Sequence, residues 1–197
     1  MTTLYKLTDQ SGCTRGPTQW GPGVSHSGTG DGDLCGPGWI HAYTHPLLAV
    51  LLNPIHAALP DPRLWEADGE IALDDSGLKV GCRTLTTLRE IPLPQITTTQ
   101  RVRFGILCAM EVCQDDSWRA WADRWLSGED RSVSAAAAYA ADAARAALYA
   151  VSAAAAYAAD AARAALYAAS AAAAYSAACT NPLNLITLAE RAVREEQ

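Results

Sequence analysis

The chain carries little positive charge. Its 15 Lys and Arg residues are outnumbered by 21 Asp and Glu residues, which leaves a net charge of -6 at neutral pH. The basic residues also form no cluster, whereas proteins that bind nucleic acid gather Lys and Arg on one face to meet the phosphates. We therefore exclude nucleic acid as a partner.

Cysteine is also sparse. Six cysteines are spread over 197 residues, and no two of them form a CxxC pair. Disulfide scaffolds and zinc sites need denser or more regular spacing. The opening MTTLYKLTDQSG has no basic segment followed by an apolar stretch, as a secretory signal would. We expect a cytoplasmic protein with free thiols, no metal and no cofactor.

The chain has no uncharged apolar run long enough to cross a membrane. Asp142, Arg145, Asp160 and Arg163 interrupt the alanine-rich tract, and its uncharged part, residues 164–179, is shorter than the roughly 20 residues that a span needs. Charged residues at a bilayer centre are costly, and alanine offsets little of that cost. We expect no membrane association.

Glycine and proline are missing from residues 131–179, where the sequence repeats itself. The eighteen residues SAAAAYAADAARAALYAV at 134–151 recur at 152–169 with one change, and a third copy begins at Ser170. Alanine has the highest helix propensity, and eighteen residues make about five whole helical turns, so every copy points its side chains the same way. The tract predicts one long helix of about 70 Å.

One side of that predicted helix is continuous alanine, which favours close packing against a second helix. We expect a homo-oligomer assembled through this face, which includes Ala136, Ala137, Ala144, Ala155, Ala162 and Ala173. The alternatives are a chain that folds back on itself and a low-complexity tail without a partner.

The part before the tract is typical of a mixed domain. Short apolar runs at 4–7, 39–43, 63–71 and 84–91 alternate with Gly, Pro, Asp and Ser, which indicates strands and loops. Thr44 and Pro46 indicate the start of a helix that Pro54 would stop. Thr97 and Gln100 have capping-box spacing, and we expect their helix to end near Cys113.

A second helix should follow, capped by Asp115 or Asp116 and closed by Gly128. Its Trp118, Trp121 and Trp125 fall on one face, a spacing typical of a core contact. The predicted fold class is α+β, with a small mixed N-terminal domain followed by a long alanine-rich α-helix. The predicted segments are a domain at 1–113, a Trp-rich connecting helix at 114–130, the long helix at 131–179 and a short C-terminal helix at 180–197.

A glycine-rich loop between residues 21 and 38 is the main candidate for ligand binding. It has neither the GxxxxGK[ST] pattern nor a strand-GxGxxG-helix context, but glycine backbone can form turns whose amides bind anions. The alternative is a plain mobile loop. The ligand-binding residues that we predict are Arg15, Gly28, Gly30, Gly32, His41, Tyr43, Lys79 and Arg83.

The stretch LCGPGWIHAYTH at 34–45 resembles a family of uncharacterised bacteriophage and prophage proteins. The similarity includes WGPGVSH, HPLLAVLLNPIHA, RLWEADGE, GLKVGCRTLTTLREI and the alanine-rich tail, and covers most of residues 4–130. The family has no assigned activity. The resemblance implies a phage or prophage setting, hence the host cytoplasm, where small proteins often counter host defence.

A looser similarity is to ADP-ribosyltransferase-like folds, in which a Gly-aromatic-x-His strand precedes a helix. It implies that His41 and Tyr43 hold a nicotinamide ribose and that Glu90 is the catalytic acid. The chain departs from that pattern because it has no ExE or QxE pair and too few residues between these positions. On the residues alone, a His on an apolar strand is more often a hydrogen-bonded core residue.

Three functions remain open from the sequence. The first is a non-enzymatic, oligomeric phage-type protein that sequesters a small anionic or nucleotide ligand. The second is a helical scaffold that assembles through the alanine-rich helix, and the third is the transferase-like enzyme.

Overall fold

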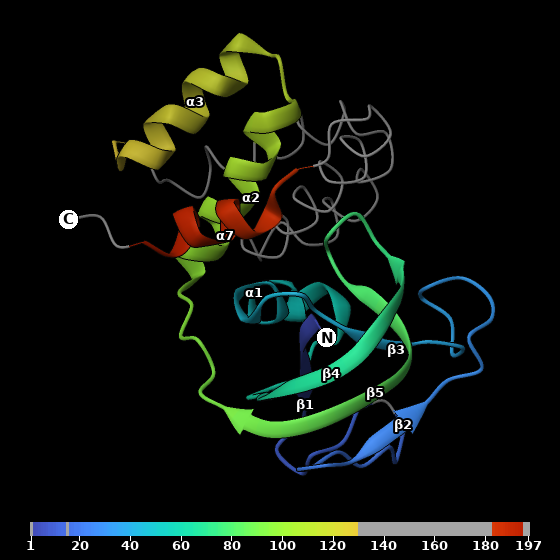
Figure 1. Cartoon of the computed structure of the whole chain (residues 1–197). Helices are drawn as coiled ribbons and strands as arrows, with labels where there is room; N and C mark the ends of the chain where they lie inside the picture. Colours follow the sequence, from blue (N-terminus) through green and yellow to red (C-terminus); the bar gives the residue numbers. More distant parts are fainter. Residues whose placement is uncertain (1, 15, 130–182, 195–197) are drawn as a thin grey trace. The chain divides into compact units, whose positions relative to one another are not determined.

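The computed structural model describes residues 2–14, 16–129 and 183–194. These fall into two compact units, residues 1–95 and 96–197 (Figure 1). Helix α2 (Thr98–Val112), which we predicted as part of the domain at 1–113, belongs to the second unit. Within the described part of the chain, no helix combines the length and hydrophobicity that a membrane crossing requires.

The first unit contains a five-stranded antiparallel sheet and one helix. Its strands are β1 (Thr2–Thr8), β2 (Ser25–Ser27), β3 (Ile40–Ala42), β4 (Arg63–Asp74) and β5 (Val80–Ile91). The order is β1-β4-β5-β2, and β3 also pairs with β5. The four strands predicted from the apolar runs are all present, and the structure adds the short strand β2.

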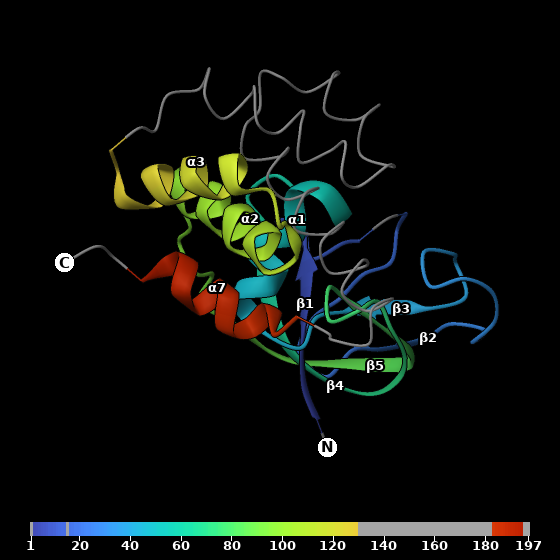
Figure 2. The same ribbon diagram turned by 90° about the horizontal axis from the view of Figure 1, so that it is seen from above.

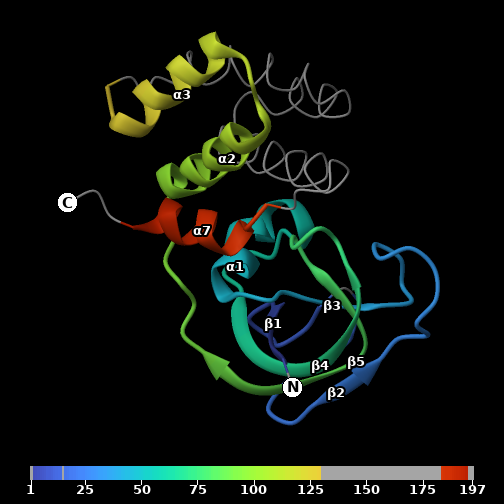
Figure 3. The ribbon, with the colours of Figure 1, turned by 45° about the horizontal axis from the view of Figure 1, so that its top comes forward.

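The sheet closes on itself. Beyond β3, Tyr43 forms a bridge to Tyr5 of β1, with N–O distances of 2.8 and 2.9 Å in the two directions. Strands β1, β4, β5 and β3 thus form a continuous ring (Figure 3). Register shifts near Ala67 and Ile71 in the β4–β5 pair add the local bends that a small barrel needs.

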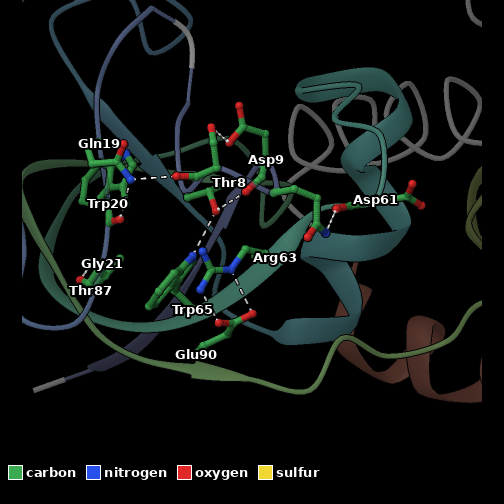
Figure 4. Close-up of polar contacts among 12 residues, drawn as sticks. Thr8, Asp9, Gln19, Trp20, Gly21, Asp61, Arg63, Trp65, Thr87 and Glu90 are labelled. Carbon is green, nitrogen blue, oxygen red and sulfur yellow. Dashed lines mark hydrogen bonds and ion pairs between the residues drawn. The ribbon is translucent and has the colours of Figure 1, made fainter.

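The interior of this barrel is apolar with a few polar groups. Its core cluster contains Leu4, Trp20, Ala42, Ala67, Val80, Cys82 and Leu85. Lys6, Thr8 and Thr87 are also buried. Thr8 accepts a 3.0 Å hydrogen bond from the indole nitrogen of Trp65, so this hydroxyl has a partner inside the fold (Figure 4).

Helix α1 (Pro46–His56) packs against β1. Its N-cap is His45, whose Nδ1 accepts from the amide of Leu47, and not the predicted Thr44. Pro46 occupies the first turn as expected. Pro54 lies inside the last turn, so the helix continues two residues past the proline that was expected to stop it.

The second unit is helical where it is described. It contains α2 (Thr98–Val112), α3 (Asp116–Ser127) and α7 (Leu185–Val193). The predicted capping box at Thr97 and Gln100 is confirmed, as are the Asp115 N-cap and the left-handed Gly128 C-cap of α3. The Trp residues of α3 pack with Val102, Ile106 and Ala109 of α2, so this stripe is core.

The described residues correct the predicted fold class. The chain is mixed α+β, but a small domain followed by one long helix is wrong. The longest described helix, α2, has 15 residues, or about 22 Å, and both α3 and α7 pack on it. Residues 131–179, for which the single long helix was predicted, lie outside the described residues. The six alanines assigned to oligomerisation lie outside the described residues.

Candidate ligand-binding site

The candidate site is built on the outer face of β5. Lys79, Gly81 and Arg83 alternate along the chain, so they share one face, opposite that of the core residues Val80 and Cys82. Strands β2 and β3 both pair with this part of β5. The glycine-rich loop that joins β2 to β3, residues 28–39, therefore begins and ends on β5.

The loop lies directly on that face. A β carbon at Gly81 would be 2.5 Å from Cδ1 of Leu34, and a β carbon at Gly30 would be 2.7 Å from Nε of Arg83. Gly30 also has a positive φ of 79°. The positive φ favours glycine at position 30, whereas a side chain at position 81 would have to displace the end of the Leu34 side chain.

Two side chains near β3 hold the loop from inside. The indole nitrogen of Trp39 donates a 2.8 Å hydrogen bond to the carbonyl of Gly32, and Nε2 of His41 donates to the carbonyl of Leu34. A carbonyl can only accept, so Nε2 carries the proton. These bonds fix the direction of two peptide groups in the loop.

The fixed carbonyls determine where the next amides point. In a trans peptide the N–H is opposite the C=O, so the amides of Asp33 and Cys35 point away from Trp39 and His41. Neither amide donates a hydrogen bond within the described residues. The amides of Gly28 and Gly30, in contrast, already bond to the carbonyls of Arg83 and Gly38. Of the amides that follow the two fixed carbonyls, both, at residues 33 and 35, are thus available donors.

Two cations accompany these amides. Nζ of Lys79 lies 3.1 Å from Sγ of Cys35, which is exposed, and Arg83 is an exposed neighbour of Gly30. Across the described ranges, neither cation forms an ion pair, whereas Arg63 and Arg89 pair with Glu90 and Glu66 at 2.5 and 2.6 Å. Lys79 and Arg83 are therefore available to an anionic ligand.

The loop also contains two carboxylates that oppose an anion. Asp31 and Asp33 are both exposed. Charge repulsion at the surface of a protein is weak and screened by salt. A bound anion must therefore lie closer to the Lys79 ammonium than to these carboxylates.

A buried lysine lies behind the site. Lys6 is 9% exposed, donates a 2.7 Å hydrogen bond to the carbonyl of His41 and lies 5.0 Å from the centre of the Trp20 ring. Burial lowers the pKa of Lys6 to about 8, although the charge of Cys82 raises it slightly. Burial raises the pKa of Cys82 to about 11. Lys6 connects β1 to β3 and is enclosed by the core.

Tyr43, predicted as a ligand contact, is buried against α1. Its hydroxyl is joined to Nδ1 of His56 at 3.2 Å, and the two rings stack with centroids 5.9 Å apart. Burial raises the pKa of Tyr43 above its ordinary value. Burial also lowers the pKa of His56 to about 4, with smaller contributions from Lys79 and His41.

The residues of the transferase alternative do not come together. His41 is opposite Gly81 and Glu90 is opposite Trp65. Glu90 is nine positions after Gly81 along β5, which is about 30 Å of extended strand. Arg63 binds both oxygens of Glu90, at 3.0 and 2.5 Å, and this hydrogen bonding lowers the pKa of the carboxyl (Figure 4).

The structure thus gathers most of the predicted ligand residues around one loop. Gly28, Gly30, Gly32, His41, Lys79 and Arg83 all lie in the loop or on the strands beneath it. Arg15 lies outside the described residues. No group of three or more His, Cys, Asp and Glu residues in the described ranges is placed to hold a metal ion.

Sequence reasoning missed the amides of Asp33 and Cys35 and the role of Trp39. A signal for them is present in GWIH, because Trp39 and His41 are two residues apart and therefore on the same side of a strand. Two ring N–H donors on the same side of a strand, directly after a glycine-rich loop, indicate side chains that can hydrogen-bond to the carbonyls of that loop.

Comparison of the chain with protein-family models, with curated proteins and with solved structures gives no match.

Proposed function

We propose that the first unit is a binding module for a small anionic ligand that carries a phosphoryl group. The observation that supports it is the pair of unbonded amides at Asp33 and Cys35, next to the Lys79 ammonium. Backbone amides held in a fixed direction bind phosphate oxygens without further ordering of the chain. Arg83, on the same face of β5, adds a second positive charge.

Binding without catalysis is favoured over the transferase alternative. Glu90, the acid that a transferase would need, is bound by Arg63 and lies about 30 Å of strand away from the residue opposite His41. The loop supplies hydrogen-bond donors, and Lys79 and Arg83 beneath it supply positive charge, which are the requirements for holding an anion.

The wider role rests on the sequence. The resemblance to phage and prophage proteins suggests sequestration of a host nucleotide, and assembly through the alanine-rich tract would multiply the sites in each particle. The scaffold alternative shares this assembly but needs no ligand. Ligand binding therefore separates the two.

Isothermal titration calorimetry of the full chain tests the proposal, with inorganic pyrophosphate and AMP as ligands. We expect saturable binding of at least one of them by the wild type. Lys79→Ala should weaken it at least about tenfold, because a charge-assisted hydrogen bond contributes about 1.5 kcal/mol or more. Arg89→Ala is the matched control, since it removes the same charge from an exposed residue paired with Glu66.

The two variants distinguish a local site from general charge attraction. Binding that falls equally in Lys79→Ala and Arg89→Ala would show that only net charge matters, and the site would be refuted. No heat with either ligand at millimolar concentration would also refute it and would favour the scaffold.

A further inference from the structure

A second candidate site lies in the helical unit. Where the end of α2 and the start of α3 meet α7, the surface forms a polar hollow of about 480 Å³. It is lined by Leu107, Met110, Glu111, Gln114, Asp116, Arg119 and Arg191. Figure 2 shows α2 between α3 and α7. The volume is within the range of about 300 to 1,000 Å³ found for small-molecule sites.

Arg119 is held in place by the end of α2. Its Nη1 donates hydrogen bonds of 2.8 Å to the carbonyls of Met110 and Cys113, which would otherwise be unpaired at the helix C-terminus. No other bond of its guanidinium is formed within the described residues. The Nε and Nη2 groups form the edge that binds a carboxylate with two parallel hydrogen bonds. That edge is therefore both fixed and available.

The remaining charges of the hollow come in both signs. Arg191 of α7 supplies a second guanidinium, and Glu111 and Asp116 supply two carboxylates. None of these three side chains is in an ion pair with another described residue. A site with two cations and two anions is balanced for a ligand that also carries both charges.

The uncharged lining fits the same class of ligand. Leu107 and Met110 give an apolar surface, and the Gln114 amide can both donate and accept a hydrogen bond. These are the groups that would contact the side chain and the peptide bond of a short peptide.

We propose that this hollow binds a small zwitterion of the amino-acid type, either a free amino acid or a short peptide with free termini. Its carboxylate contacts Arg119 and Arg191, and its ammonium contacts Glu111 and Asp116. This site is in the second unit and is independent of the anion site in the first.

Titration of the full-length protein, followed by calorimetry, tests the proposal. The ligands are alanine, trialanine and N-acetyl-trialanine amide, which has neither charge. We expect alanine or trialanine to bind in the millimolar range or tighter, and the blocked peptide to bind at least tenfold more weakly. Stronger binding of trialanine than of alanine would identify a peptide as the preferred ligand.

Substitutions then locate the binding. Arg191→Ala and Glu111→Gln should each weaken binding at least fivefold, whereas Arg194→Ala, an exposed arginine outside the lining, should leave it unchanged. Arg119→Lys keeps a donor for the α2 carbonyls but loses the two-bond edge, and should weaken binding as well.

Three results would overturn the proposal. The first is the absence of heat with both charged ligands. The second is equal binding of the blocked peptide, which would show that the charges of the ligand do not matter. The third is an equal loss in Arg194→Ala and Arg191→Ala, which would place the binding elsewhere.

Discussion

Lys6 and His41 are 35 residues apart in the sequence, and the Lys6 ammonium donates a 2.7 Å hydrogen bond to the carbonyl of His41. Together with the bridge between Tyr5 and Tyr43, this bond connects β1 to the β3 segment and closes the barrel. The same His41 holds the ligand loop through its ring. The core and the candidate anion site are therefore connected through one residue.

The buried Lys6 should make folding depend on pH. Burial lowers its pKa from 10.5 to about 8, so between these values the unfolded chain binds more protons than the folded chain. The free energy of unfolding therefore rises as the pH increases above 8. Below pH 8 the buried, charged Lys6 destabilises the fold by its full amount, roughly 3 kcal/mol. Lys6→Met does not carry this penalty. We therefore expect its free energy of unfolding, minus that of the wild type, to decrease by about 1.4 kcal/mol between pH 7 and pH 9.

Urea unfolding at the two pH values measures this difference. The comparison with the variant is needed because Cys82, whose pKa is raised to about 11, has the opposite effect above pH 9. A pH-independent difference between variant and wild type would show that Lys6 is not a buried, titrating amine.

His56 should have a comparable effect in acid. Its pKa is lowered to about 4, so as the pH falls from 6.5 to 4 the unfolded chain takes up a proton that the folded chain does not. Stability is lost over that window, and we expect about 1–2 kcal/mol between pH 7 and pH 5. His56→Gln should remove the loss. Tyr43→Phe, which breaks the 3.2 Å contact but leaves the imidazole in place, should retain it.

The elements that could be predicted from the sequence are those with local signals. Thr97 and Gln100 specify the start of α2 through their own side chains, and Gly128 ends α3 because it adopts a positive φ. The strands follow from short apolar runs. The closure of the sheet could not be predicted, because it depends on Tyr5 meeting Tyr43 across a loop.

The packing of the helical unit shows where local reasoning fails. Helices α3 and α7 both contact α2, and α7 is far from α2 in the sequence, so no local pattern contains this arrangement. The candidate site is an intermediate case. Lys79, Arg83 and the glycines could be selected by residue type, whereas the amides of Asp33 and Cys35 depend on how Trp39 and His41 hold the loop.

The tryptophan face of α3 should determine the stability of the helical unit. Trp118 is 4% exposed, and its ring lies 6.0 Å from that of Trp121. Trp118→Ala leaves a cavity that should cost roughly 3–5 kcal/mol. Limited proteolysis of the full chain, with cleavage sites mapped by mass spectrometry, should show new cuts in residues 98–127. Equal new cutting in residues 2–95 would show that the two units do not unfold separately.

Asp33 gives the strictest test of the anion site, because removing it should improve binding. Its amide is a proposed donor, and its exposed carboxylate repels the ligand that this amide would hold. Asp33→Asn keeps the backbone and the side-chain shape but removes the charge, so pyrophosphate should bind several-fold more tightly at low salt. The gain should shrink above about 0.5 M salt, where charges beyond a few ångströms are screened.

Asp68→Asn is the matched control, since Asp68 lies on β4 opposite Thr86 and not in the loop, and its loss changes the net charge equally. Tighter binding in both variants would mean that the ligand responds to net charge alone. Weaker binding of pyrophosphate in Asp33→Asn would contradict the expected repulsion and would refute this placement of the anion. An increase confined to Asp33→Asn, combined with the loss in Lys79→Ala, would place the anion between the Asp33 and Cys35 amides and the Lys79 ammonium.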